Sequence, residues 1–248
     1  MKYLTIIDDN NAYGGFTSGD NGVWSREEAS DPPTDDYKAL SSRLGVPLTR
    51  IIRPYQAGGD KAEIADAEHG GAGVIKDDPF KKTDGLVTAE KGLVLSIIAA
   101  DCVPVYLIDK KAGVVGLLHC GRRSAAGKLI HNGVQRMIEL GASPADIQMT
   151  IGPHICCGCH EVSEEAAKEY AGAFTAAELN EIFDLSSGSR RLDLAKAVTF
   201  KAAAEGIQPG NISDAGECTC HDMSYYSYRR GDRGRQNLAF IMMKQTAR

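Results

Sequence analysis

Two apolar runs joined by a short polar turn constrain the fold of this chain more than any other feature. The runs span 103–108 and 114–118, and the segment 109–113 between them contains Asp, two Lys and Gly. Apolar, β-branched runs separated by a few turn-forming residues are typical of an antiparallel hairpin. In such a hairpin the far ends of the strands meet, so the residue before the first strand lies near the residue after the second.

Cys102 and His119 occupy those two positions. The hairpin therefore predicts that the thiol and the imidazole are neighbours. A Cys beside a His is either an activated nucleophile or part of a metal site. A buried structural role is the alternative for both residues, and the spacing alone leaves it open.

The residues after His119 carry positive charge into a predicted helix. Arg122 and Arg123 precede a set of apolar residues at helical spacing, which Gly141 ends; these lie at positions 129, 130, 134, 137 and 138. Arginine side chains and helix N-termini both favour anions. We therefore expect an anion to bind beside Cys102 and His119.

Composition limits the classes of protein to which the chain can belong. Its 248 residues suffice for one large α/β domain or two small ones, and nothing in them marks a linker. No apolar stretch approaches the roughly 20 residues of a membrane span, and the N-terminal segment turns acidic at Asp8 and Asp9. We therefore expect a cytoplasmic protein with no membrane partner.

Charge and cysteine content narrow the ligands further. The formal net charge of −5 argues against a general nucleic-acid binder and favours small anionic ligands at local basic clusters. The seven cysteines are odd in number and partly adjacent. This pattern fits reduced thiols or metal ligands better than a secreted disulfide framework.

Predicted strands and helices alternate along the chain, which favours an α/β layered domain. We expect a surface loop at 8–22 and a polar insertion or lid at 60–84. A capping box at 175–178 predicts the start of one helix. The other expected elements are strands at 3–7, 49–56, 147–151, 191–194 and 237–243, and helices at 35–44 and 195–205.

Short motifs occur in order along almost the whole chain, at 15–18, 84–88, 100–104, 113–116, 119–123, 151–153, 159–162, 193–194, 218–219, 226–230 and 234–236. Together they resemble those of the YfiH-type proteins. That family was long labelled multicopper polyphenol oxidases or laccase-domain proteins and has since been associated with zinc-dependent purine nucleoside chemistry. The resemblance implies one α/β domain over 1–248, a single layered domain of mixed β-sheets flanked by helices. This fold is similar to the cysteine-hydrolase-like fold of the necrotizing-factor toxins.

The resemblance also implies a zinc site with one Cys and two His ligands. Cys102 and His119 match two of these ligands, but Gly58 stands where the second His is expected, and Arg122 replaces a Trp. Losing one ligand of three weakens zinc binding. His69 is the nearest candidate replacement, with His160 and His221 as further candidates.

The function implied by the resemblance is that of a purine nucleoside phosphorylase-like enzyme acting on inosine or adenosine, with adenosine deamination as a further reaction. Its catalytic residues would be Cys102, His119 and Arg123. Arg123 and Arg230 would bind phosphate, so the partners would be small molecules, a purine nucleoside and phosphate. Two alternatives remain open: a metal-free hydrolase or amidase in which His119 takes the proton of Cys102, and an inactive relative. Copper-dependent polyphenol oxidation is least favoured, because six histidines so arranged do not supply several copper sites.

A second group of potential metal ligands lies apart from Cys102 and His119 in the sequence, and two of its members, Cys159 and Cys218, fall within these motifs. It contains Cys156, Cys157 and Cys159 in one segment and Cys218, Cys220 and His221 in another. Four thiolates from the two segments would make a structural zinc site. The Cys-x-Cys spacing at 218–220 is atypical of such sites, so buried, metal-free thiols are the alternative.

Overall fold

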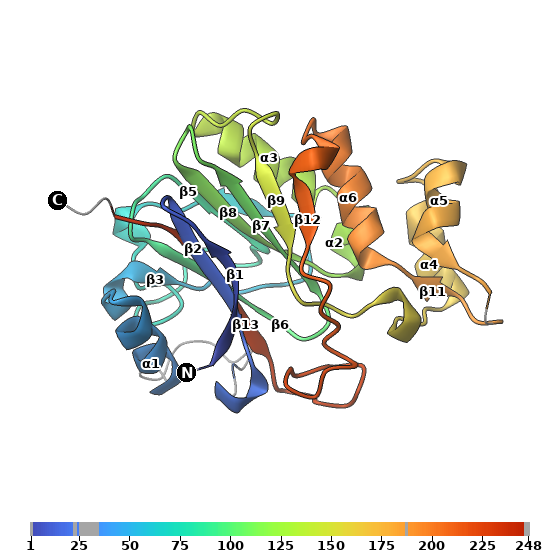
Figure 1. Ribbon diagram of the computed structural model, residues 1–248, viewed down its shortest axis with the longest axis horizontal. Helices are drawn as coiled ribbons and strands as arrows, with labels where there is room; N and C mark the ends of the chain where they lie inside the picture. Colours follow the sequence, from blue (N-terminus) through green and yellow to red (C-terminus); the bar gives the residue numbers. More distant parts are fainter. Residues whose placement is uncertain (1, 22–23, 25–34, 187, 246–248) are drawn as a thin grey trace.

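Two β-sheets packed face to face form the centre of the structure (Figure 1). The computed structural model describes residues 2–21, 24, 35–186 and 188–245. The five-stranded sheet has the order β1-β2-β13-β6-β3 and is antiparallel except for the β3–β6 pair. Its strands are β1 (Tyr3–Asp8), β2 (Ala12–Thr17), β13 (Asn237–Met243), β6 (Val94–Ala99) and β3 (Ile51–Ile52).

The six-stranded sheet contains the predicted hairpin at its centre. Its order is β12-β9-β7-β8-β5-β4, with parallel pairs only at the two edges. The strands are β12 (Ile212–Asp214), β9 (Gln148–Ile151), β7 (Val103–Asp109), β8 (Val114–Cys120), β5 (Gly85–Thr88) and β4 (Ala62–Ile64). Strands β7 and β8 pair in register from Val103 opposite Cys120 to Asp109 opposite Val114, so the hairpin prediction is confirmed.

Side-chain alternation along the strands sorts the core into layers. On β7, Tyr106 and Ile108 pack between the two sheets, whereas Val105 and Leu107 face the helices on the other side. On β6, Leu95 and Ile97 likewise face the second sheet. These strands are buried on both faces, which explains why they read as continuous apolar runs rather than as alternating ones.

Helices cover both outer faces of the paired sheets. Helix α1 (Asp35–Leu44) packs on the five-stranded sheet, and α2 (Arg122–Ala126), α3 (Leu129–Glu139) and α6 (Leu194–Ala204) pack on the six-stranded sheet. Helices α4 (Glu164–Ala171) and α5 (Ala176–Ile182) lie beyond α6, beside the short strands β10 (Phe183–Asp184) and β11 (Arg191–Leu192) (Figure 1). The prediction of an α/β fold with mixed sheets and flanking helices is confirmed. None of the described helices is long and apolar enough to cross a membrane.

Most element predictions hold at their centres. Helix α1 and strand β13 have the expected bounds, and the capping box of Thr175 with Glu178 begins α5. The single helix expected after His119 is two helices, because Gly127 breaks it and α3 restarts at Leu129. The strands expected at 49–56 and 191–194 shrink to Ile51–Ile52 and Arg191–Leu192, since a 3-10 turn (Leu48–Arg50) precedes the first and Leu194 begins α6.

The predicted loop at 8–22 is wrong at its centre, because residues 12–17 form the buried strand β2. The glycines of this strand allow neighbouring strands to pack closely and do not form a turn. A Cβ on Gly15 would lie 2.8 Å from the ring of Phe240 and 2.9 Å from the carbonyl oxygen of Leu4. Glycine in a strand often marks such a close approach, and composition alone cannot distinguish it from a glycine in a loop.

The predicted lid at 60–84 is also wrong. Strand β4 joins the six-stranded sheet, and the segment buries side chains along its length: Ala62, Ala65, Ala72, Val74 and Phe80. Its backbone packs closely on the preceding segment, because a Cβ at Gly73 would lie 1.8 Å from the Arg53 carbonyl oxygen. This segment is therefore part of the packed body of the protein.

We predict that Gly73→Ala destabilises the protein more than Gly45→Ala. Both glycines have φ of +67°, but an added Cβ meets nothing within 4 Å at Gly45. The left-handed backbone should cost about 1 kcal/mol in either variant, and the clash at Gly73 should add about 1–3 kcal/mol. Urea denaturation measures both free energies of unfolding. Equal values for the two variants would contradict the close packing of this segment.

Candidate active site

The hairpin places Cys102 beside His119, as predicted. Pro104 pairs with His119 across the two strands, so Cys102 lies just beyond the same end of the hairpin. The Cys102 thiol is a hydrogen-bond partner of the His119 imidazole. His119 is buried and Cys102 is half-buried. The pair therefore lies at the boundary between the core and the solvent.

A third residue, Asp84, holds the His119 imidazole from its other side. His119 Nδ1 lies 3.0 Å from Asp84 Oδ1, and the backbone N–H of His119 donates to the Asp84 carbonyl at 2.7 Å. Asp84 precedes strand β5, in which Gly85 pairs with Leu118 of β8. Sequence reasoning missed this role of Asp84, because the pairing of β5 with β8 joins segments more than 30 residues apart. The available signals were the acidic residue just before an apolar strand and its place at the start of the motif at 84–88.

The Asp84 carboxylate is fully buried and is held by a tight backbone turn. It accepts N–H hydrogen bonds from Ala57 at 3.1 Å, Gly58 at 2.9 Å and Gly59 at 2.9 Å. A carboxylate that accepts several backbone hydrogen bonds is stabilised in its charged form. One oxygen of this carboxylate, Oδ1, contacts both the backbone N–H of Gly58 and the imidazole of His119.

Burial and the neighbouring groups shift the pKa values of His119 and Asp84 in opposite directions. Burial lowers the pKa of His119, but the negative charge of Cys102 and the hydrogen bond to Asp84 outweigh it and raise that pKa to about 9. Burial raises the pKa of Asp84, yet hydrogen bonds from His119 and the 57–59 backbone lower it overall. At neutral pH the imidazole is therefore protonated and the carboxylate ionised. The three side chains are arranged as a Cys–His–Asp triad, in which Asp84 fixes the orientation of His119.

A cleft of about 540 Å³ opens over Cys102 and His119. This volume falls within the roughly 300–1,000 Å³ of small-molecule sites. The walls include two guanidinium groups, a second imidazole, a phenol, an amide and two aliphatic side chains, from Arg122, Arg229, His160, Tyr228, Gln236, Ile155 and Leu194. The cleft therefore combines positive charge, hydrogen-bonding groups and apolar surface.

The second imidazole of the cleft belongs to His160. It is neutral at pH 7, whereas that of His119 is protonated. Burial and the nearby charge of Arg229 lower the pKa of His160 to about 4. Its Nδ1 lies 3.2 Å from the Leu192 carbonyl oxygen, so Nδ1 carries the proton and Nε2 is left as an acceptor. Titratable groups whose pKa values are driven apart in one site are suited to separate acid and acceptor roles.

Asp101 joins the segments that form the rim of the cleft. Its backbone is left-handed, with φ of +84°, and its carbonyl accepts from the Ile155 N–H at 3.0 Å. Its carboxylate accepts from the Thr219 hydroxyl at 2.7 Å and from the Arg229 N–H at 2.6 Å. Asp101 thus links three distant segments directly beside Cys102.

The two arginines that line the cleft are adjacent in sequence to the two that were expected to bind phosphate. Within the described part of the chain, the cleft lining includes Arg122 and Arg229 but neither Arg123 nor Arg230. Arg123 is exposed on α2, one residue around the helix from Arg122. The Arg230 guanidinium is engaged by backbone carbonyls, including those of Thr219 and Cys220, and by the carboxylate of Asp232. Arg230 therefore stabilises its own loop.

The metal site implied by the resemblance does not form around Cys102. His69 Nδ1 lies 2.7 Å from Asp66 Oδ1 in a local capping box, and its ring packs on Phe80. Among the described residues, His, Cys, Asp and Glu side chains form a group of three or more potential ligands only at Cys156, Cys159, Cys218 and His221. Hence His69 does not complete a three-ligand site, and Cys102 and His119 do not fit the expected zinc ion.

Position 58 leaves open the space where the missing ligand was expected. Gly58 has φ of +71°, and an added Cβ would meet nothing within 4 Å. The turn that contains it still wraps around Asp84. The framework of the expected site is therefore present without its second His.

The fold and site define a class: a layered α/β protein with a thiol, an imidazole and a buried carboxylate at one end of a central hairpin. Comparison with known families identifies it, since residues 15–244 match the multi-copper polyphenol oxidoreductase laccase family. The chain belongs to this family.

Relatives and a solved structure agree with that assignment. A protein of Deinococcus radiodurans named purine nucleoside phosphorylase is 34% identical over 90% of this chain and 83% of its own. A protein named adenosine deaminase RL5, from an unknown prokaryotic organism, is 30% identical over 79% of this chain and 76% of its own. The crystal structure of the Bacillus licheniformis hypothetical protein YfiH matches with a TM-score of 0.82 and 27% identity, over 94% of this chain and 93% of that chain.

We predict that His119 titrates near pH 9 and that Asp84→Asn lowers this midpoint. Asparagine keeps the shape of the side chain but removes the charge that favours the imidazolium. Because the folded pKa exceeds the ordinary value of 6.5, the pair stabilises the protein fully below pH 6.5, and this stabilisation is lost as pH rises through 9. Histidine ring NMR resonances give the midpoint, and denaturation at several pH values gives the stability.

Asp109→Asn is the matched control. Asp109 is a buried carboxylate that also accepts backbone N–H bonds, from Lys111, Ala112 and Ser143, at the other end of the hairpin. Its replacement should reduce stability without moving the His119 midpoint. If Asp84→Asn leaves the midpoint at 9, Asp84 does not set the charge of His119.

Proposed function

We propose that this protein is an enzyme that cleaves purine nucleosides with phosphate in the cleft above Cys102 and His119. The observation that carries the proposal is a protonated His119, held between Cys102 and the buried Asp84, at a cleft of small-molecule size. The substrate class is taken from the names of relatives such as the Deinococcus radiodurans protein.

The cleft offers groups that suit each part of a nucleoside. Tyr228 exposes 60% of its surface and presents an aromatic face on which a purine can stack, while Tyr225 is buried elsewhere. Gln236 and the Nε2 acceptor of His160 can hydrogen-bond to base or sugar groups. Ile155 and Leu194 supply apolar surface. Such a mixture is typical of ligand pockets.

Phosphate would be held by Arg122 and Arg229. The Arg229 guanidinium donates to the carbonyls of Cys159 and Glu161, which fixes its position and leaves its other N–H groups for a ligand. Arg122 pairs with Glu169, a partly exposed carboxylate. An exposed ion pair contributes little free energy, so a phosphate ion can compete for Arg122.

The reaction can be written with these residues alone. A phosphate oxygen forms a bond to C1′ of the sugar, and the bond from C1′ to the purine nitrogen breaks. The electron pair passes to the purine, and a proton from His119 neutralises the departing base. The interactions of His119 with Cys102 and Asp84 raise its pKa to about 9 and so keep it protonated until that transfer. No step passes through a metal, because the donor set does not fit one.

A thiol hydrolase or amidase is the second candidate, and Asp84 is the observation that favours it. Asp84, His119 and Cys102 stand in the order of a Cys–His–Asp triad, in which an oriented imidazole activates a thiol. Cys102 would attack an acyl carbon, and His119 would give its proton to the departing amine. Water would then release the acyl group from the sulfur.

Multicopper oxidation is not proposed despite the family's name. Copper sites of that kind need many imidazole ligands in several clusters. Among the described residues, the side chains that come together as a group of three or more potential metal ligands include a single histidine, His221. The described side chains therefore supply no set of copper sites.

We predict that Cys102→Ala reduces nucleoside turnover by about 100-fold or more, the size of a general-acid contribution, because His119 loses the thiol that raises its pKa. Release of hypoxanthine from inosine and of adenine from adenosine is measured with and without phosphate, and inosine formed from adenosine reports deamination. Cys157→Ser is the control, because Cys157 is a half-buried free thiol outside this cleft. It should retain the parent activity.

The outcomes separate the two candidates. Phosphate-dependent release of the base supports phosphorolysis. Amide hydrolysis that depends on Cys102, without nucleoside turnover, supports the thiol hydrolase. If Cys102→Ala keeps full turnover of every substrate, the site assignment is wrong.

We predict that Gly58→His adds one zinc equivalent to the protein and suppresses activity. The imidazole would complete a three-ligand site with Cys102 and His119, and bound zinc would occupy the thiol. Gly45→His, with φ of +67° in open space, is the control for the backbone strain. Competition with a chromophoric chelator measures zinc, and parallel assays measure turnover. Higher activity in Gly58→His would instead support a metal-dependent mechanism weakened in this chain. If zinc binding does not increase, position 58 is not at the site.

A further inference from the structure

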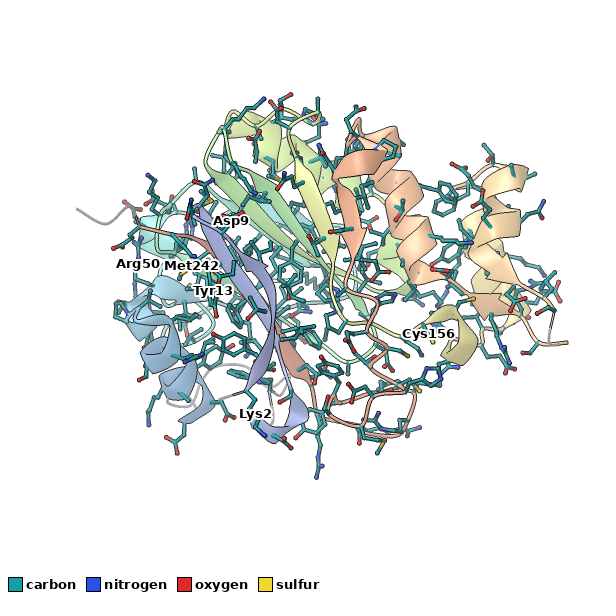
Figure 2. All side chains as sticks on the ribbon, viewed as in Figure 1. Lys2, Asp9, Tyr13, Arg50, Cys156 and Met242 are labelled. Carbon is teal, nitrogen blue, oxygen red and sulfur yellow. The ribbon has the colours of Figure 1, made fainter. Side chains whose placement is uncertain are left out.

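Three thiols and an imidazole from two distant segments meet beside the cleft. Cys156 begins, and Cys159 ends, the turn that leads from β9 towards α4 (Figure 2). Cys218 and His221 lie between β12 and β13. One ligand atom from each of the four side chains lies within 4.8 Å of all the others. None of these residues is used in the reaction proposed above.

The donor atoms are close enough for one ion to reach all four. Cys159 Sγ lies 3.0 Å from Nε2 of His221, and Cys156 Sγ lies 3.8 Å from the other ring nitrogen, Nδ1. A single ion would bind one of these two nitrogens. Zinc bonds of about 2.3 Å to sulfur and 2.0 Å to nitrogen imply ligand separations of about 3.5–3.8 Å. With one donor atom of each side chain within 4.8 Å of the others, small shifts of the side chains would bring all four to these separations around one zinc ion.

The structure also removes the objection that the Cys-x-Cys spacing at 218–220 raised against a metal site here. The second segment contributes Cys218 and His221, so the pattern is Cys-x-x-Cys followed by Cys-x-x-His, and Cys220 is not needed. Both spacings are usual for structural zinc sites. Backbone geometry adds support, because the Cys156 N–H points at Cys218 Sγ at 3.3 Å. Sulfur ligands of zinc are commonly oriented by such outer hydrogen bonds.

We propose that Cys156, Cys159, Cys218 and His221 bind one structural zinc ion. Three thiolates and one imidazole close the coordination of zinc, leaving no position for water or substrate. Thiolates also select zinc over magnesium or calcium, which prefer oxygen ligands. This inference does not depend on the proposed reaction.

The ion would join the two segments that supply opposite parts of the cleft wall. The first segment carries Ile155 and His160, and the second leads to Tyr228 and Arg229. The two segments also meet through backbone hydrogen bonds, between His154 and Glu217 and between Thr219 and His154. The Arg229 guanidinium adds its bond to the Cys159 carbonyl. Zinc would fix this junction and so the width of the cleft.

Elemental analysis of the full-length protein, purified under reducing conditions, tests the proposal. We expect one zinc per chain in the parent protein and in Cys102→Ala. The double variant with Cys156→Ser and Cys159→Ser should lose the zinc. Cys157→Ser and Cys220→Ser are matched controls from the same two segments and should retain it.

Cobalt substitution provides a test that does not depend on folding of the variants. Parent protein stripped with a chelator and reloaded with cobalt(II) should show the visible absorption of a tetrahedral thiolate site. Removal of zinc should lower the melting temperature, and zinc should restore it. A metal-free parent protein after growth with added zinc, octahedral cobalt, or disulfides among these cysteines by mass spectrometry would overturn the proposal. Loss of zinc in Cys102→Ala would place the ion at the other site instead. None of these results depends on nucleoside turnover.

Discussion

The buried carboxylate of Asp84 is the interaction on which the site depends. A fully buried charge is unfavourable unless it is paired and hydrogen-bonded. Asp84 meets that requirement with His119 and with the backbone of 57–59. One side chain thereby joins the turn after β3, the start of β5 and the end of β8. The orientation of His119, and through it the environment of Cys102, follows from this single group.

The central hairpin and the pairing of Cys102 with His119 could be predicted because they depend on local order. Residues 103–120 contain both strands and the turn, so alternation and turn chemistry suffice to bring the two ends together. Asp84 could not be found this way, since its position opposite His119 requires a strand pairing between distant segments. The sequence could not show either that Arg122 and Arg229 line the cleft, rather than their neighbours Arg123 and Arg230. Which arginine faces the cleft depends on the face of α2 from which each side chain projects. It also depends on which guanidinium the loop carbonyls bind.

Two errors of sequence interpretation share a physical cause. Segments 8–22 and 60–84 are rich in glycine and polar residues, which are typical of loops. Gly15 and Gly73 are instead positions where other atoms come too close for a side chain. The potential metal ligands are a separate case. The zinc ion expected at Cys102 rested on the family resemblance, whereas the second group of thiols could be named from the sequence itself, and the structure brings Cys156, Cys159, Cys218 and His221 together.

The position of β13 has a consequence for how this protein is made. It lies between β2 and β6 in the five-stranded sheet, and Asn237 bonds to Ala99 across 138 residues of sequence. During synthesis, β2 and β6 must therefore wait with unpaired edges until residues 237–243 have left the ribosome. Exposed strand edges can pair with other chains. The five-stranded sheet thus completes late, and the nascent chain should depend on chaperones until β13 has been made.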